Sequence, residues 1–223
     1  MSLDLEIVRV QHNTPEWLAY RLSGIGGSDA AAVLGLSPFK TNVEIWEEKV
    51  GARRAEDISD KPYVLYGQEA ETPLVSLFRL DYPEYSAAID KTVVYRRGFM
   101  FASLDGELTE CASGRRGVLE VKTTELYKRA DLSKWNGRIP MYYYIQVLHQ
   151  LIVTGWDFSV LKAQIKLPTP QDGQQETITR HYTFERKDRL ADMKYLYLKE
   201  REFWGYVERR ERPPFLLPSL EKQ

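Results

Sequence analysis

The stretch FASLDGELTECASGRRGVLEVKTT, residues 101–124, decides the fold. An apolar run that ends at Asp105 and a second run over residues 117–122 flank a polar loop that contains glycine, and this pattern predicts two strands. Because side chains alternate across a strand, Glu120 and Lys122 share one face. If the two strands pair, Asp105 can reach Glu120. An Asp, a Glu and a Lys would then meet on one sheet surface.

Composition narrows the class of protein. The 223 residues suit one globular domain with a sizeable core, and 43% apolar and 28% charged residues are typical of soluble folded proteins. No apolar run reaches the roughly 18 residues of a membrane span, and the charged N-terminal segment is unlike a signal peptide, so we expect a cytoplasmic protein. The lone Cys111 excludes an intrachain disulfide, and no Cys/His cluster predicts zinc.

The net charge of -1 gives no sign of a nucleic-acid partner, but the charges are unevenly distributed. Residues 91–140 hold ten basic and six acidic side chains, a local excess of four positive charges. Such a segment could attract a polyanion or could be an ordinary solvated surface, and both interpretations stay open.

Helix signals come first along the chain. Capping residues predict helices that begin at Thr14, at Ser28 and at Thr41, the last with a capping box to Glu44. A fourth helix, over about 64–78, is expected to be bent or interrupted near Pro73. Strands are predicted at about 86–96, 98–105, 117–123, 157–166 and 176–184, and helices at about 140–154 and 187–210.

This order predicts an α/β or α+β fold in which a central mixed sheet is flanked by helices. We expect a single domain over residues 1–223. It would have a helical part at 1–80, a sheet core at 86–184 and a C-terminal helix at 187–210. A loosely held tail would follow from Pro213.

The charged residues of the opening stretch suit phosphate chemistry. Hydrolysis of a phosphodiester needs neutralised charge and a nucleophilic water, which a pair of divalent cations supplies. Magnesium takes one or two carboxylates and keeps several waters, a role that fits Asp105 and Glu120 with the main-chain carbonyl of Val121. Lys122 could orient or deprotonate the attacking water. By itself, however, this short motif favours the plainer alternative of an exposed hairpin with a Glu–Lys neighbour pair.

Five blocks, in order along the chain, carry a family resemblance. They are WLAYRLSGIGGS at 17–28, YGQEAE at 66–71 followed by LF at 77–78, SLDG at 103–106, LEVK at 119–122, and QVLHQ at 146–150 followed by VTG at 153–155. Together they resemble the phage recombination exonucleases of the lambda exonuclease and YqaJ type, within the PD-(D/E)xK nuclease superfamily. Leu104 stands where that superfamily name has proline, and the segment between Asp105 and Glu120 is longer than usual.

The resemblance implies a restriction-endonuclease-like core and a metal site. Asp105, Glu120 and the Val121 carbonyl would hold Mg²⁺, with two ions in each site and Mn²⁺ as an alternative. Lys122 would lie at the attacking water. Glu71 would be an outer acid that helps to bind the second ion; without the resemblance it reads as a surface helix acid.

The same resemblance implies a pocket for a terminal 5′-phosphate, formed by Arg21, Ser28, Ser103 and Gln146, with Trp17 near the DNA end. A predicted helix N-terminus at Ser28 suits an anion, and the planar fork of Arg21 can bind one. Local alternatives stay open for each residue: Ser28 as a simple cap, Arg21 in a surface ion pair, and Gln146 in a buried structural hydrogen bond. Trp17 reads more simply as a helix-packing residue.

The implied function is a Mg²⁺-dependent 5′-to-3′ exonuclease on duplex DNA with 5′-phosphorylated ends. It would release mononucleotides and leave 3′ overhangs for single-strand annealing recombination. The implied partners are DNA ends, a single-strand annealing protein and two further copies of the chain in a homotrimer. The setting would be a bacterial cell, with the protein encoded by a phage or prophage. Two alternatives are a restriction-type or structure-specific endonuclease on the same core, and a DNA-end-binding module without catalysis.

Overall fold

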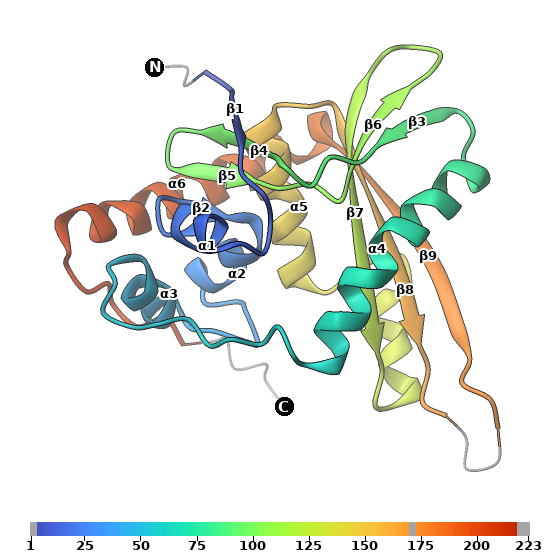
Figure 1. Ribbon diagram of the computed structural model, residues 1–223, viewed down its shortest axis with the longest axis horizontal. Helices are drawn as coiled ribbons and strands as arrows, with labels where there is room; N and C mark the ends of the chain where they lie inside the picture. The colour runs from blue at the N-terminus through green and yellow to red at the C-terminus, as the bar shows by residue number, and fades with distance from the viewer. Residues whose placement is uncertain (1–3, 170–172, 218–223) are drawn as a thin grey trace.

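The computed structural model describes residues 4–169 and 173–217, and within these ranges the strands form two sheets (Figure 1). The smaller sheet has the order β1-β4-β5-β2, from β1 (Glu6–Arg9), β2 (Ile25–Gly26), β4 (Val93–Arg97) and β5 (Met100–Ala102). The larger has the order β3-β6-β7-β8-β9, from β3 (Tyr85–Ala88), β6 (Gly106–Glu110), β7 (Arg116–Glu125), β8 (Phe158–Lys166) and β9 (Thr177–Glu185). Both sheets are mixed, because β2–β5 and β7–β8 are parallel pairs. The α/β class is confirmed, with two mixed sheets in place of one.

Helices cover both faces of the larger sheet. Helix α4 (Pro62–Asp81) packs on one face of β7, and α5 (Met141–Thr154), which connects β7 to the parallel β8, packs on the other with α6 (Leu190–Arg209) beside it (Figure 1). The short helices α1 (Pro15–Arg21), α2 (Gly27–Val33) and α3 (Asn42–Lys49) complete the N-terminal part, and α2 lies against α5. Two 3₁₀ turns span Arg129–Trp135 and Arg186–Arg189. In the described ranges, no helix is both long and apolar enough to cross a membrane.

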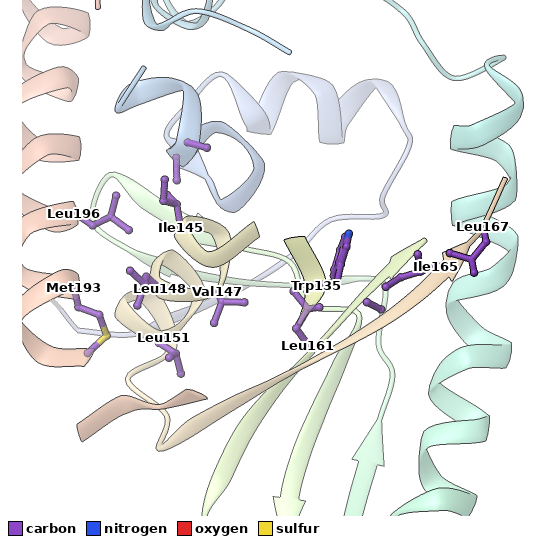
Figure 2. Packing of buried hydrophobic residues seen from close by; sticks show 13 residues of the cluster. Trp135, Ile145, Val147, Leu148, Leu151, Leu161, Ile165, Leu167, Met193 and Leu196 are labelled. Carbon is purple, nitrogen blue, oxygen red and sulfur yellow. The ribbon is translucent and has the colours of Figure 1, made fainter. Parts of the chain in front are cut away.

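The cluster of apolar side chains between α5, α6 and β8 fixes the position of α5. Figure 2 shows Ile145, Val147, Leu148 and Leu151 of α5 beside Leu161 and Ile165 of β8 and Met193 and Leu196 of α6. All of these side chains are buried. Burying a large apolar side chain stabilises a fold by about 1.5–3 kcal/mol, so α5 is firmly held and its polar residues have fixed positions.

Strand β7 alternates as the sequence predicts. Leu119 and Val121 pack in the cluster that contains Leu74 and Phe78 of α4. Glu120 instead points toward α5, where it accepts hydrogen bonds from that helix. The two faces of one strand therefore separate the apolar packing from the charged groups.

The hairpin that contains β7 differs from the prediction. The expected strand 98–105 ends at Ala102 in the smaller sheet, and the chain then crosses to the larger sheet, where β6 pairs with β7 and Gly106 lies opposite Leu119. Residues 106–110, expected in a loop, are a strand. Glycine fits at 106 because a Cβ there would lie 3.2 Å from the Leu119 Cβ. Asp105 thus lies in the crossing between the sheets, at the end of β6.

Two helix predictions also need correction. The N-cap of α2 is Gly26, not Ser28, and the Asp29 carboxylate accepts the Gly26 N–H at 3.2 Å. Helix α4 runs through Pro73 without interruption. Pro73 lies on the exposed side, while Leu74 and its buried neighbours hold the helix on the sheet at that point.

The C-terminal tail is not loosely held over its described part. The buried Asn42 side chain donates to the Pro214 carbonyl at 2.8 Å and accepts the Leu216 N–H at 3.0 Å. Residues 213–217 are therefore anchored on α3, and the rest of the expected tail, 218–223, lies outside the described residues. The predicted strand 86–96 is also two strands, β3 and β4, which belong to different sheets.

Candidate active site

A cavity of about 170 Å³ lies where the chain crosses from the smaller sheet to the larger one. Of the ten residues predicted for the site, eight line it: Trp17, Arg21, Ser28, Ser103, Asp105, Glu120, Lys122 and Gln146. A larger open groove of about 860 Å³ runs along α6, but none of these eight residues lines it. The small cavity is therefore the candidate active site.

Glu120 is held on all sides at the floor of the cavity. Its side chain is only 2% exposed, and Oε1 lies 2.5 Å from the Lys122 ammonium. The amide of Gln146 donates to Oε1 at 2.6 Å, and the amide of Gln150 donates to Oε2 at 2.5 Å. Three donors therefore fix the orientation of this carboxylate.

Asp105 joins Glu120 from the crossing between the sheets. Its Oδ2 accepts the Val121 N–H at 2.7 Å, which ties the crossing to β7 beside Glu120. Burial, together with the nearby carboxylates of Glu120 and Glu71, raises the pKa of Asp105 well above its usual range. Negative charge is thus in excess at this end of the cavity, and a cation would relieve it.

Lys122 is the cation already present. Burial alone would lower its pKa, but the carboxylates of Glu120 and Asp105 outweigh that effect and raise it. Its ammonium also lies 5.3 Å from the centre of the Tyr143 ring. In this state Lys122 is a fixed positive charge.

The donor set fits a hard divalent cation. Two carboxylates and a neighbouring main-chain carbonyl, at Val121, are the oxygen ligands that Mg²⁺ or Mn²⁺ accepts while it keeps several waters. Among residues 4–169 and 173–217, no three His, Cys, Asp or Glu side chains gather at a site that could hold a metal ion. An ion held by the carboxylates of Asp105 and Glu120 and the Val121 carbonyl would complete its coordination with waters and substrate oxygens.

Glu71 stands apart from the cavity lining. It belongs to α4, on the other face of β7, and its carboxylate lies 3.4 Å from the ammonium of Lys91. Burial, only partly offset by Lys91, raises the pKa of Glu71, and the charge of Glu120 adds to the effect. Gly67, one turn earlier, also faces β7, and a Cβ there would make an ordinary contact, 3.4 Å from the Thr123 hydroxyl. Glu71 therefore acts on Asp105 and Glu120 through its charge, without lining the cavity.

At the opposite end of the cavity, basic groups gather around one buried carboxylate. Asp29 lies 3.2 Å from the Arg21 guanidinium and 2.7 Å from the Lys49 ammonium. Burial would raise the pKa of Asp29, but Lys49 and Arg21 hold it well below its usual range. Arg21 also donates to the Ser28 hydroxyl at 3.4 Å and remains 38% exposed. Two cations against one carboxylate leave a net positive charge here.

Close backbone packing brings these groups together. At Gly24 a Cβ would lie 2.5 Å from the Phe99 carbonyl oxygen, and at Gly27 a Cβ would lie 3.3 Å from Gln146. The glycine-rich turn after α1 therefore lets α2 approach both β5 and α5. Trp17 is buried against the Phe101 ring, 5.9 Å between centroids, so it forms a wall of the cavity.

The family model that matches this chain is described as the YqaJ-like viral recombinase domain, and it matches residues 16–157. That range holds every residue of the cavity lining. The chain belongs to this family.

Other comparisons agree with the YqaJ-like assignment. The protein YqaJ of Bacillus subtilis is 30% identical over 205 residues, which are 85% of this chain and 55% of that protein, so the chain spans about half the length of this relative. The alkaline exonuclease LHK-Exo of Laribacter hongkongensis has the same fold, with a TM-score of 0.59, 16% identity, and coverage of 88% of this chain and 96% of that one. Its complex with dAMP matches with a TM-score of 0.58 at the same identity and coverage. A phage-related exonuclease of Haemophilus somnus matches with a TM-score of 0.53 and 10% identity over 84% and 96% of the two chains.

Three further residues of this YqaJ-like site were not predicted from the sequence: Asp29, Lys49 and Gln150. Gln150 carries a helical signal, because it follows Gln146 by four residues and must share its face of α5. Asp29 follows Ser28 directly, but nothing local indicates that it is buried. Lys49 lies on α3, and only the tertiary fold brings it to Arg21, whose carbonyl it also contacts at 2.7 Å.

Proposed function

We propose that this chain is a Mg²⁺-dependent exonuclease that degrades one strand of duplex DNA from a 5′-phosphorylated end, in the 5′-to-3′ direction. The observation that carries the proposal is the charge distribution of the cavity lining: Arg21 and Ser28 in one part, Asp105, Glu120 and Lys122 in the other. Lys49 lies behind Arg21 and pairs with the same buried Asp29. A phosphate fits the first part and a divalent cation the second. Family membership and the alkaline exonuclease fold support the same interpretation.

At the negative end, Asp105, Glu120 and the Val121 carbonyl would hold two Mg²⁺ ions, with Glu71 assisting from α4 and Mn²⁺ as an alternative. When bound, the ions neutralise charge on the scissile phosphate and make a water nucleophilic. Lys122, a fixed cation, orients that water and contacts the phosphate. Gln146 keeps Glu120 oriented from α5.

At the positive end, Arg21, Ser28 and Ser103 would bind the terminal 5′-phosphate, with Gln146 between the two ends and Trp17 as a wall. A group held there selects phosphorylated ends, because Arg21 and Lys49 would otherwise keep an uncompensated charge. A cavity of about 170 Å³ suits a single terminal group, in keeping with mononucleotide release. LHK-Exo has been solved in complex with dAMP, a mononucleotide.

The assembly belongs to the same proposal. Resemblance to the lambda exonuclease type suggests a ring-shaped homotrimer around the DNA and a single-strand annealing protein as partner, in a phage or prophage recombination system. Sedimentation or light scattering would give three times the mass of one chain for the trimer. A monomer at micromolar concentration would remove the ring from the proposal.

The experiment that tests the function compares linear duplex DNA with closed circular DNA, in Mg²⁺ and in excess chelator. Mononucleotides released from linear DNA alone, only with metal and starting at the 5′ end, are the expected result. Cleavage of the closed circle would favour the endonuclease alternative. Binding of DNA ends without any cleavage would favour a module without catalysis.

A further inference from the structure

Gln150 is a buried amide at the cavity whose carbonyl oxygen is unpaired within the described residues. It lies on α5 one turn after Gln146, it is 1% exposed, and it lines the cavity. Its Nε2 donates to Glu120 Oε2 at 2.5 Å. Its Oε1 has no hydrogen-bond partner among the residues that the structure describes.

The orientation of this amide is fixed by Glu120. Turning it over would place its oxygen against a carboxylate oxygen, and both atoms are acceptors. An apolar side chain of similar size would avoid the cost of a buried, unpaired carbonyl. The buried Oε1 therefore lacks a donor among the described residues, and a donor from outside the chain would satisfy it.

The chemistry of the cavity limits what that donor can be. Phosphate oxygens are acceptors and do not satisfy a carbonyl. Beside Asp105 and Glu120, the available small donor is water, and divalent cations keep several waters when only one or two carboxylates bind them. Groups that form hydrogen bonds to such waters, or to the metal ligands, change the affinity of the site for the metal.

We propose that Gln150 is a positioning residue for the divalent cation: Nε2 fixes Glu120, and Oε1 accepts a hydrogen bond from a water in the hydration shell of the cation. This inference rests on the metal site of the proposed function. It gives Gln150 a role different from that of Gln146, which donates to the Glu120 oxygen that also contacts Lys122.

The test measures Mn²⁺ binding by calorimetry, without DNA. Gln150→Met removes both hydrogen bonds and is expected to weaken Mn²⁺ binding by about 10–100-fold. Gln150→Glu keeps an acceptor oxygen but repels Glu120, so it should lower the melting temperature of the metal-free protein and yet bind Mn²⁺ more tightly than Gln150→Met. Gln164→Met is the matched control, because Gln164 bonds Tyr66 outside the cavity lining.

Wild-type affinity in a folded Gln150→Met variant overturns the proposal, and so does a Gln150→Glu variant that binds no better than Gln150→Met. If Gln150→Met does not fold, the Gln150→Glu variant decides. A Mn²⁺ affinity at or above the wild-type value supports the positioning role of Gln150, and weaker Mn²⁺ binding overturns it. Glu120→Gln separates this inference from the proposed function. Unchanged Mn²⁺ binding in Glu120→Gln would refute the proposed metal site itself. Mn²⁺ binding that is lost in Glu120→Gln but kept in Gln150→Met would refute only the role of Gln150.

Discussion

At the scale of single residues, Lys122 supplies a positive charge beside the carboxylates of Glu120 and Asp105. Its ammonium contacts Glu120, and both Glu120 and Asp105 raise its pKa. A lysine that stays protonated at neutral pH is better suited to orient a water and a phosphate than to remove a proton. Of the two roles open from the sequence, we therefore favour orientation.

Lys122→Ala is expected to lower the rate of DNA cleavage by about 10²–10⁴-fold, because positioning of the reacting groups is lost. Calorimetry should show Mn²⁺ binding largely intact, and a gel-shift assay should show retained DNA binding. Lys134→Ala is a suitable control, since Lys134 forms an exposed ion pair with Asp131. DNA binding lost in step with cleavage would make Lys122 a binding residue instead.

Asp105→Asn should separate stability from function. A carboxyl group whose folded pKa is raised stabilises the fold below its unfolded pKa, and this contribution is lost as pH rises through the folded pKa. The metal-free variant should therefore melt at a higher temperature than wild type at pH 8, with little difference near pH 3, while its Mn²⁺ binding weakens. Thermal melts of both proteins from pH 3 to pH 8 measure the difference in melting temperature. A variant that melts below wild type at pH 8 would contradict the prediction.

At the scale of elements, the residues of the candidate active site come from three elements that meet at the cavity. Strand β7 provides Glu120 and Lys122, helix α5 provides two amides, and the crossing between the sheets provides Asp105. The apolar cluster of α5, α6 and β8 holds the helix in place behind its polar face (Figure 2). Under the same face, His149 contacts the Phe101 carbonyl at 2.9 Å and Glu200 at 2.8 Å, which ties β5 to α5 and α6.

The anchored tail leads to a prediction at this scale. Asn42→Ala removes two hydrogen bonds to residues 213–217, so the free energy of unfolding should fall by about 1–3 kcal/mol. Urea denaturation measures the loss, and limited proteolysis should cut the tail sooner. Asn136→Ala is the control, because it removes a single exposed hydrogen bond, the one that Asn136 accepts from Arg180. Equal stability of Asn42→Ala and wild type would mean that the tail does not contribute to the fold.

Local patterns predicted the elements well, since the caps at Thr14 and Thr41 and the alternation along β7 depend on neighbours in sequence. They failed where partners distant in sequence decide. Residues 98–105 look like one strand, but the two sheets divide the segment, and Asp29 displaces Ser28 from the capping role by bonding Gly26. Asn42 binds the C-terminal tail and Lys49 contacts Arg21. Both contacts are long-range, and nothing in the neighbouring sequence indicates them.

At the scale of the whole molecule, the chain crosses between two sheets (Figure 1). The cavity, with its carboxylates and its basic residues, lies at that crossing. The excess of basic residues in 91–140 does not by itself form a binding surface, because several of them pair with acidic side chains: Arg115 with Glu185, Arg116 with Glu107, and Arg129 with Glu176. The plainer interpretation of that segment holds for these residues. Recognition of the DNA end would then depend mainly on the cavity.

The measurement that tests this account most directly is the ratio of cleavage rates on duplexes with 5′-phosphate and 5′-hydroxyl ends, in Mg²⁺, for wild type and Arg21→Ala. We expect a strong preference for the phosphorylated end in wild type and its loss in Arg21→Ala, at a largely unchanged rate on the hydroxyl end. Arg9→Ala, which removes an exposed arginine paired with Asp90, should keep the preference. Equal rates on both ends in wild type would contradict the account of the cavity.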